Sequence, residues 1–362
     1  MPTAGSRRRP WRWGPSRLSC SIEGAGNPPG RLRRNRSGRS MSTGGDAMLC
    51  LRFLNVADGD AILVEDGDFR MLVDAGRDIV AFDPPAADCA AHLKALGVRH
   101  IDLAVITHLH IDHMGGLERI MDEGIAIDRL VSGYFPSQPG LILPASLDAE
   151  DTVEKMTWHL DLWSEQIARL MAAGTRCEEI RSTVKGLRLT ERLEADITLP
   201  DVAVQAFQDR VWEAMFHGGA VSYDEQYAAS KLRNPNSLRV RLRYAGREIE
   251  LSGDCLGAVW EREDIAPCDL FKVPHHGDAK SVTELLVEKL RPAHAVISTG
   301  RTYLPEKDRP SRAVATLLRE CGAQVWYTDS VDDGVGPVRR WPYVRFIIRE
   351  DGALVPPSGE EP

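Results

Sequence analysis

Residues 107–113 carry the stretch of sequence that decides the fold, THLHIDH. It follows the apolar run Ile101–Ile106, which predicts a buried strand, and it precedes the glycine pair at 115–116. Three imidazoles and one carboxylate within six residues of a loop are the nitrogen and oxygen donors that zinc, manganese or iron prefer. We therefore predict that four residues of this loop bind metal: His108, His110, Asp112 and His113.

Two later strand ends supply further donors. Residues 249–254, IELSGD, place Asp254 at the edge of an apolar run, and Gly253 permits a close backbone approach. Residues 271–277, FKVPHHG, place a histidine pair in the same way. A site for two metals needs a bridging carboxylate and a histidine from elsewhere in the chain. Asp254 and one of the two histidines, His275 or His276, are predicted to meet the first cluster.

The charge of the chain is unevenly distributed. The net charge of the 362 residues is −8, but residues 1–40 hold ten arginines and one acid, so the remaining residues carry about −17. Nucleic-acid binding by broad charge attraction depends on Lys and Arg that neutralise phosphates. The main body is therefore not expected to bind nucleic acid through its overall charge, although a local basic groove stays open as an alternative.

Cysteine usage and hydropathy indicate the compartment. The seven cysteines are scattered, form no CxxC pair and are odd in number, which favours a reducing environment. No run approaches the roughly 18 consecutive apolar residues of a membrane span. These features predict a soluble, cytoplasmic protein that does not associate with a membrane.

Composition divides the chain into three parts. Residues 1–47 mix Arg with Gly, Pro and Ser, which predicts a disordered basic leader; an organelle transit peptide, or a true start at Met41 or Met48, would also account for it. Residues 48–355 are predicted to form one domain, and residues 356–362 a flexible tail. Within the domain, a helical insertion around 135–235 is expected over the site mouth, where it would determine substrate choice.

Strand and helix patterns alternate through the domain. Apolar residues at steps of three and four predict a helix of about seven turns over 148–173 and a second over 204–215. Ala245-Gly246, between two strand patterns, indicates a hairpin. Two mixed β-halves with helices between them predict an α+β sandwich. The expected strands are 49–56, 61–65, 69–73, 101–106, 238–244, 247–251, 269–273, 293–298, 324–327 and 344–348.

These motifs resemble a known family. HxHxDH after a strand, SGD at a later strand end and PHHG beyond it are similar to the metallo-β-lactamase fold of hydrolases, and residues 71–76, MLVDAG, match the first Asp motif of that fold. The resemblance covers residues 49–330. Five shorter motifs resemble the hydrolase domain of ComEC-type DNA-uptake proteins and their stand-alone relatives: NVADGDA at 55–61, NSL at 236–238, KVPHHG at 272–277, STG at 298–300 and YTD at 327–329.

The resemblance implies an αββα four-layer sandwich with two metals at one end. His108 and His110 would bind the first metal, and Asp112 and His113 the second. Asp254 would bridge them, and His275 or His276 would complete the second metal. Asp74 would act as an acceptor that orients ligands or a water. The residues implied in catalysis are Asp112, Asp254 and Asp74.

The chain departs from the family pattern between the first cluster and Asp254. Many members have another histidine there, whereas this chain has NPNS at 234–237, as ComEC-like relatives also tend to. The first metal would then have fewer protein ligands. Asn234, Asn236 and His217 are candidates for first-metal or substrate contacts, and His159, one position from the apolar face of its helix, is expected to be structural. A GHTxGH run is absent, which disfavours lactone and thiolester hydrolysis.

The sequence thus predicts a hydrolase with two divalent metal ions, zinc or manganese. A hydroxide held between the metals would attack the substrate, which we expect to be a small-molecule or nucleic-acid phosphodiester, so that a nuclease is among the candidates. Two alternatives stay open. One is a hydrolase of lactones, thiolesters or amides on the same fold, and the other is a metal-binding module without turnover.

Overall fold

The computed structural model describes residues 48–77, 88–145, 150–300, 309–329 and 342–357. Asp46–Pro362 forms one unit by its internal contacts. The predicted leader at 1–47 lies outside the described residues, and so does most of the predicted tail. None of the described helices combines the length and the apolar character that crossing a membrane requires.

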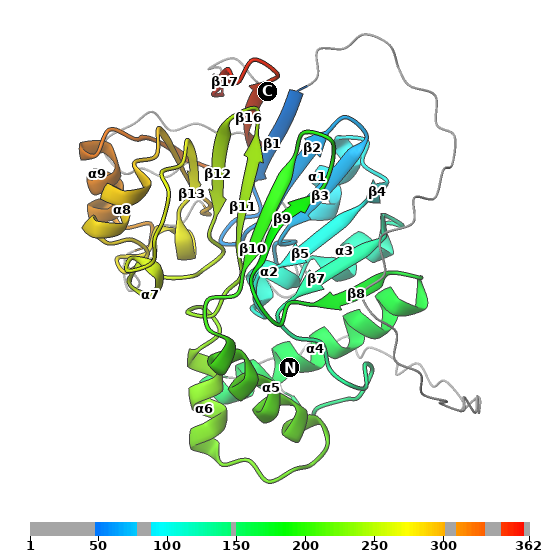
Figure 1. Ribbon diagram of the computed structural model, residues 1–362. Coiled ribbons are helices and arrows are strands. Elements are labelled where there is room, and N and C mark those ends of the chain that lie inside the picture. The colour runs from blue at the N-terminus through cyan, green and yellow to red at the C-terminus, as the bar shows by residue number, and fades with distance from the viewer. Residues whose placement is uncertain (1–47, 78–87, 146–149, 301–308, 330–341, 358–362) are drawn as a thin grey trace, which may run out of the picture. The chain divides into compact units, whose positions relative to one another are not determined.

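Eight strands form the first sheet, in the order β17-β16-β1-β2-β3-β5-β7-β8 (Figure 1). Its strands alternate faces as a pleat requires, so that Leu63 of β2 faces one side while Ile62 and Val64 face the other. β3, β5, β7 and β8 run parallel, so their carboxyl ends point the same way. The strands are β1 Met48–Leu54, β2 Ile62–Asp66, β3 Phe69–Val73, β5 Leu103–Ile106, β7 Arg129–Ser132, β8 Arg176–Glu179, β16 Tyr343–Arg349 and β17 Leu354–Val355.

Seven strands form the second sheet, in the order β15-β14-β13-β12-β11-β10-β9. The predicted hairpin joins β11 and β12 through Ala245 and Gly246, both with positive φ. From β12 to β15 the strands are parallel. The strands are β9 Val184–Arg188, β10 Glu194–Thr198, β11 Arg239–Tyr244, β12 Arg247–Leu251, β13 Leu270–Lys272, β14 His294–Ile297 and β15 Gln324–Tyr327; β4 His100–Ile101 and β6 Ala126–Ile127 pair separately.

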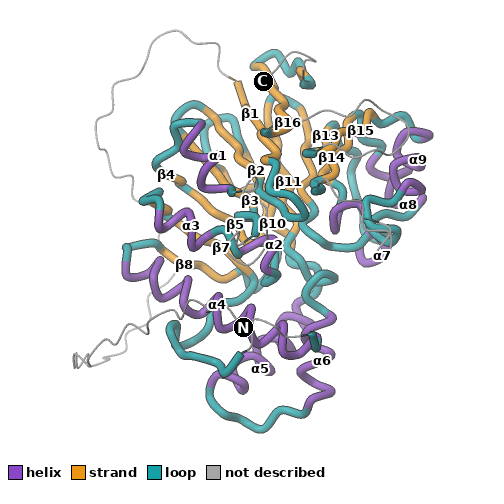
Figure 2. The backbone as a smooth tube through the Cα atoms, turned by 180° about the vertical axis from the view of Figure 1, so that it is seen from behind, coloured by secondary structure: helices purple, strands orange, loops and turns teal. Residues whose placement is uncertain are grey.

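Three apolar clusters separate four layers. One lies between the sheets, one between the first sheet and α1, α3 and α4, and one between the second sheet and α7, α8 and α9. Figure 2 shows from behind the helices that cover the first sheet, α1, α3 and α4. The predicted α+β sandwich is therefore confirmed. The helices are α1 Cys89–Ala95, α2 Ile111–Met114, α3 Leu117–Asp122, α4 Thr152–Ala172, α5 Val202–Phe216, α6 Tyr223–Lys231, α7 Gly257–Trp260, α8 Glu284–Leu290 and α9 Arg312–Glu320.

The structure differs from the sequence-based expectation in the predicted insertion and in the metal-binding stretch. The stretch 135–235 contains α4, α5 and α6, but also β8, β9 and β10, which belong to the two sheets. The metal-binding stretch is also not wholly a loop, because α2 begins at Ile111, directly after His110. Asp112 and His113 therefore point from a helical turn whose position the strand end fixes.

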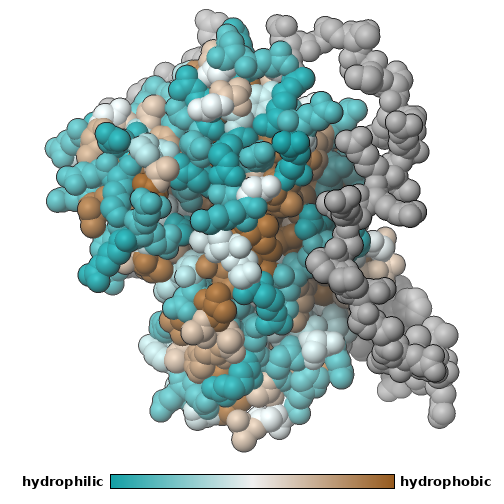
Figure 3. Space-filling view, viewed as in Figure 1, coloured by the Kyte–Doolittle hydropathy of each residue, from teal (hydrophilic) through white to brown (hydrophobic). Residues whose placement is uncertain are grey.

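Ion pairs cover the outer face of the second sheet near β11. Arg241 lies 2.7 Å from Glu248, and Arg243 lies 2.7 Å from Asp196. Figure 3 shows hydrophilic side chains over much of this face. Acids and bases are thus paired here, and the face does not present an unbalanced positive charge for a nucleic-acid backbone.

Candidate metal centre

The centre lies where the carboxyl ends of parallel strands from both sheets meet. β3 ends before Asp74, β5 ends before Thr107, and β12 ends before the turn that carries Asp254. Gly116 follows the first donor cluster, and a Cβ there would lie 2.0 Å from the carbonyl oxygen of Ala75. Only glycine permits this close approach, which brings the two strand ends together.

Asp74 orients the metal-binding stretch, residues 107–113, through hydrogen bonds. Its carboxylate accepts hydrogen bonds from the backbone N–H of Thr107 at 2.8 Å, from Thr107 Oγ1 at 2.9 Å and from His113 Nδ1 at 2.8 Å. Asp74 is 1 % exposed, and the side chain of His113 is fully buried. Because Nδ1 of His113 donates to Asp74, its Nε2 is left with a lone pair that faces the centre.

His108 is anchored in the same manner by hydroxyl groups. Its Nδ1 lies 3.1 Å from both Thr107 Oγ1 and Ser237 Oγ, while Nε2 lies 2.8 Å from Nδ1 of His110. Since Thr107 Oγ1 donates to Asp74, it accepts from Nδ1 of His108. Nε2 of His108 and Nδ1 of His110 then turn toward each other, as two ligands of one ion would.

Asp254 reaches the centre from the second sheet. Gly253 before it has φ +51°, and a Cβ there would lie 2.5 Å from Ser237 Oγ, so the turn requires glycine. Oδ2 of Asp254 lies 3.3 Å from His113 Nε2 and 3.8 Å from His108 Nε2. Asp254 therefore lies between the two histidines that the sequence assigned to different metals.

The histidine pair after β13 divides its roles. Both residues have positive φ, which turns their side chains apart. His276 is fully buried, its Nδ1 donates to the Ser298 carbonyl at 3.2 Å, and its Nε2 lies 3.3 Å from Asp112 Oδ2. His275 instead lies 2.5 Å from Asp278 and contributes its backbone N–H to Asp254. Of the two alternatives left open by the sequence, the geometry favours His276.

The donor atoms suit a cation. Three histidines, His108, His113 and His276, donate through Nδ1 and face carboxylate oxygens with Nε2. Nε2 atoms of His113 and His276 are buried and make no hydrogen bond to the described residues. A lone pair and a carboxylate oxygen about 3 Å apart repel each other unless a proton or a metal ion lies between them. The residues present therefore fit a metal centre.

The directions of the pKa shifts also indicate that the centre favours a cation. For His113, burial would lower the pKa, but Asp254 and Asp74 outweigh it and raise the pKa well above its usual value. For Asp254 and Asp112, burial would raise the pKa, but contacts with the neighbouring histidines hold it well below the usual range. Burial is the largest effect on Asp74 and raises its pKa, with His113 opposing. The centre thus favours positive charge between its carboxylates.

Three triplets of potential ligand atoms overlap at His113, and two of them contain further predicted metal ligands. His108, His113 and Asp254 form the first of these two, and Asp112, His113 and His276 form the second; the remaining triplet joins His113 to Asp60 and Asp74. Burial, above all, lowers the pKa values of His108 and His110 well below the usual value, so both are neutral and able to bind metal. His110 belongs to neither triplet, although it contacts His108.

A buried charge pair that the sequence did not indicate supports the centre. The ammonium group of Lys272, fully buried, forms an ion pair with Asp60 and lies 3.8 Å from Asp254 Oδ1. Asp60 in turn lies 3.7 Å from His113 Nδ1. Both residues fall in motifs that the sequence singled out, but Asp60 reads there as a turn residue and Lys272 as part of a strand.

The three candidates for extra contacts interact with other groups of the chain or have no described partner. Asn236 accepts a hydrogen bond at 2.9 Å from the backbone N–H of Asp201, the residue that caps α5. The side-chain oxygen of Asn234 is buried and has no hydrogen-bond partner among the described residues. His217 contacts Ser137 at 3.0 Å and is 39 % exposed in its side chain. His217 belongs to neither ligand triplet.

His159, which we expected to be structural, lies at the edge of the centre. Its ring centroid is 5.8 Å from that of His110, and its Nδ1 lies 2.8 Å from Nη1 of Arg233. Burial, aided by Arg233, lowers the pKa of His159 to about 3, so the ring is neutral. Sequence periodicity could not separate this residue from a core histidine, because it lies beside the apolar face of α4.

Part of the chain that contains the centre is similar to known proteins. Residues 54–166 match the family described as the metallo-beta-lactamase superfamily, and the match includes Asp74 and the donors of residues 107–113. The chain has the metallo-β-lactamase fold. With its cluster of histidine and aspartate ligands, the chain is consistent with a metal-dependent hydrolase. No curated protein sequence matches it.

The solved structures that are similar to this chain share little of its sequence. The metallo-beta-lactamase fold protein YhfI from Bacillus subtilis is 8 % identical, with a TM-score of 0.42 over 77 % of this chain and 96 % of that one. Zinc-bound PqqB from Methylobacterium extorquens is 10 % identical, with a TM-score of 0.40 over 77 % and 97 %. The short form of human tRNase Z is 13 % identical, with a TM-score of 0.35 over 68 % and 91 %.

Proposed function

We propose that this chain is a hydrolase that uses two divalent metal ions, zinc or manganese, to cleave phosphodiesters. One observation carries the proposal. Histidine nitrogens and carboxylate oxygens from distant parts of the chain meet at one end of both sheets, where they face one another as metal ligands would. His108 and His110 would hold the first ion, Asp112, His113 and His276 the second, and Asp254 both. Bound ions would supply charge and activate a water molecule at neutral pH.

The residues of the chain prepare this chemistry without a serine or cysteine nucleophile. Asp74 and Thr107 fix the tautomers of His113 and His108, and the backbone N–H of His275 holds Oδ1 of Asp254 at 3.0 Å. The second carboxylate oxygen of Asp254 is then free to face the ligand triplet. Most of the set is buried, although the side chain of Asp112 is 21 % exposed, and burial strengthens the electrostatic contacts.

A phosphodiester is supported by charge and by the motifs. Two bound metal ions would be the largest local charge in a chain whose main body is acidic, and they would attract an anionic ester. The shorter motifs, among them NVADGDA at 55–61 and KVPHHG at 272–277, resemble ComEC-type hydrolase domains. The substrate is therefore proposed to be a small-molecule or nucleic-acid phosphodiester.

One observation favours a second candidate, a metal-binding module without turnover. The first ion would have three protein ligands, because Asn236 binds the α5 N-terminus and not the centre. A weakly held first ion would leave a single filled site. Occupancy of the two sites therefore separates this candidate from the hydrolase.

Metal analysis and parallel assays test the proposal. The purified protein is analysed for bound metal, loaded with zinc or manganese, and assayed on bis-p-nitrophenyl phosphate, single-stranded DNA, a lactone and a cephalosporin. We expect two ions per chain and cleavage of the phosphodiesters. His113→Ala should abolish both, whereas the control His294→Ala, at the amino end of β14 and outside every group of potential metal ligands among the described residues, should change neither.

Two other outcomes would contradict phosphodiester cleavage. Cleavage of the lactone or cephalosporin alone would replace the proposed substrate class with carbonyl compounds. One bound ion and no cleavage of any substrate would favour the metal-binding module.

A further inference from the structure

A buried arginine beside the centre lacks a carboxylate partner. Arg233 is 5 % exposed, and no described Asp or Glu lies within ion-pair distance of it. Its hydrogen bonds go to neutral acceptors: Nε donates to the Ser230 carbonyl at 3.1 Å, and Nη1 donates to the Leu109 carbonyl at 2.9 Å. Nη1 also donates to Nδ1 of His159 at 2.8 Å.

This placement is unfavourable, and a second buried arginine among the described residues shows how such a charge is usually paired. Arg239 is also 5 % exposed, but it lies 2.6 Å from Glu263 and packs over the ring of Trp260. A buried charge without such a partner destabilises the folded state. Burial lowers the pKa of Arg233 to about 9, which still leaves the guanidinium charged at neutral pH. The positive charge of Arg233 therefore does not stabilise the fold through an ion pair, as that of Arg239 does.

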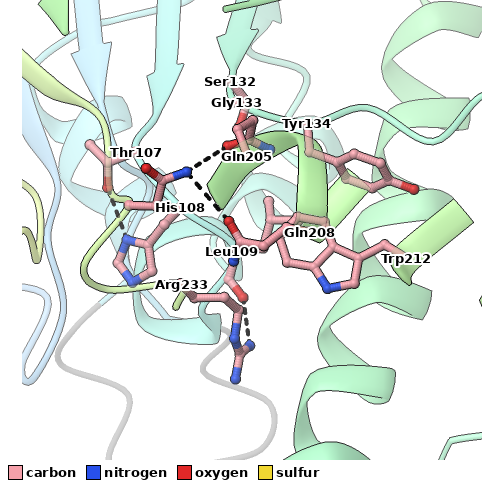
Figure 4. Close-up of a pocket in the computed structure, with 11 residues that line it drawn as sticks. Thr107, His108, Leu109, Ser132, Gly133, Tyr134, Gln205, Gln208, Trp212 and Arg233 are labelled. Carbon is pink, nitrogen blue, oxygen red and sulfur yellow. Dashed lines mark hydrogen bonds between the residues drawn. The ribbon is translucent and has the colours of Figure 1, made fainter. Parts of the chain in front are cut away.

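The position of Arg233 connects this charge to the metal centre. It bonds to Leu109, the residue between the predicted ligands His108 and His110, and it lines a small cavity of about 20 Å³ together with His108. Figure 4 shows the guanidinium below the His108–Leu109 turn. The other polar groups on the cavity wall are neutral, and no acid lines it: Thr107, Ser132, Tyr134, Gln205, Gln208 and Asn236.

Metal binding would increase the imbalance. Among the described residues, the anion that stabilises the charge of Arg233 is Asp112, and its carboxylate belongs to the second ligand triplet. A metal ion on Asp112 would neutralise that carboxylate. Nη2 of Arg233 makes no hydrogen bond to the described residues. The loaded protein would therefore present a free donor and an unbalanced positive charge beside the first metal.

We infer that Arg233 binds a phosphoryl oxygen of the substrate next to the first metal. The planar guanidinium offers donors in a geometry that suits phosphate oxygens. This inference rests on the proposed function, because it assigns to the same centre the group that selects an anionic ester over a neutral one. The substrate anion supplies the negative charge that the fold leaves out.

Variants at position 233 test this role with inorganic phosphate as the probe. R233Q and R233K are compared with the wild type and with the control R239Q, which removes an equally buried but paired arginine. Phosphate binding to each metal-loaded protein is measured by calorimetry, together with metal content and with KM and kcat for bis-p-nitrophenyl phosphate. Single-stranded DNA is assayed in parallel and distinguishes a nucleic-acid substrate from a small one.

We expect R233Q to weaken phosphate binding and raise KM by about 10- to 100-fold, the range of a lost charge-assisted hydrogen bond. R233K should recover part of the loss, because it keeps the charge but not the planar fork. Metal content should stay unchanged in both, and R239Q should bind phosphate as the wild type does. If R233Q does not fold, R233K carries the test, with a several-fold loss of phosphate affinity.

The failure of this inference is distinguishable from that of the proposed function. Wild-type phosphodiester cleavage with unchanged phosphate affinity and KM in R233Q would overturn the role of Arg233 alone. Loss of metal from R233Q would also overturn it, because Arg233 would then act on the ligands. Absence of cleavage by the wild type, with phosphate binding that still depends on Arg233, would support the anion site and reject the activity.

Discussion

Nε2 of His113 lies 3.3 Å from Asp254 Oδ2, while its Nδ1 lies 2.8 Å from Asp74 Oδ2, so a carboxylate faces each end of one buried imidazole. A neutral imidazole has only one proton for these two acceptors. In the metal-free protein the second carboxylate is balanced by protonation of the ring, which is why the pKa of His113 lies well above its usual value. A metal ion at Nε2 would replace that proton.

Metal affinity should therefore rise with pH through the neutral range. Because the pKa of His113 is raised in the metal-free protein, binding must displace a proton there, and one proton corresponds to about tenfold in affinity per pH unit. Calorimetry of zinc binding in buffers with different ionisation enthalpies counts the released protons. Affinity that does not change between about pH 6 and 8 would show that His113 binds no metal.

Asp74→Asn should weaken metal binding without removing a ligand. The carboxylate accepts from Thr107 and His113, and an amide in its place cannot accept equally from all three donors. Loss of such an orienting acceptor costs about 10- to 100-fold in metal affinity. Chelator competition measures the effect, with Asp102→Asn as the control, since Asp102 accepts from the N–H of Arg70 away from the centre. Equal affinities would exclude an orienting role.

Glu179 should make stability depend on pH. Burial, above all, raises the pKa of its carboxyl group to about 7, against 4.5 in the unfolded chain, although Arg181 opposes the shift. Between these values the folded state holds a proton that the unfolded state releases, so the free energy of unfolding falls as pH rises from about 4.5 to 7. We expect Glu179→Gln to remove about 1–2 kcal/mol of that decrease, because partial exposure screens the charge. Urea unfolding at pH 5 and 7 tests this.

Sequence patterns predicted the buried parts of the fold well. Strands such as β11 and β16 bury nearly every second residue, and the parallel strand β5 is apolar throughout, so each carries a clear hydrophobic signal. Of the strands that were missed, β7 and β10 lie inside their sheets, whereas β8 ends the first sheet and β9 ends the second. No residue of β8 or β9 is fully buried, and both strands have few apolar residues. An edge strand that is open to water needs no apolar alternation.

The centre was predictable where donors follow strand ends, and not where ordinary residues surround them. His108, His113 and Asp254 stand out in the sequence because polar donors directly follow apolar runs. Arg233 and Ser237 have no such signal, because they reach the centre from the connection between α6 and β11. Nor could spacing distinguish His275 from His276, since two successive residues with positive φ turn them in different directions.

Lys272 and Asp60 provide a final test of how the centre is held together. Lys272 is fully buried and donates to the Gly253 carbonyl at 2.8 Å, in addition to its ion pair with Asp60. Lys272→Met should reduce the free energy of unfolding by about 3–5 kcal/mol, because it leaves the carboxylate of Asp60 buried without its partner. The second change, Asp60→Asn, should restore part of that loss in the double variant.

A double-mutant cycle from urea unfolding measures this coupling for the metal-free protein. Coupling of about 1 kcal/mol or more, with the double variant more stable than Lys272→Met alone, is expected from a pair that neutralises itself in the interior. Additive losses would instead mean that Lys272 acts through Gly253 and Asp254. In that case the same variants should weaken metal binding more than they weaken the fold.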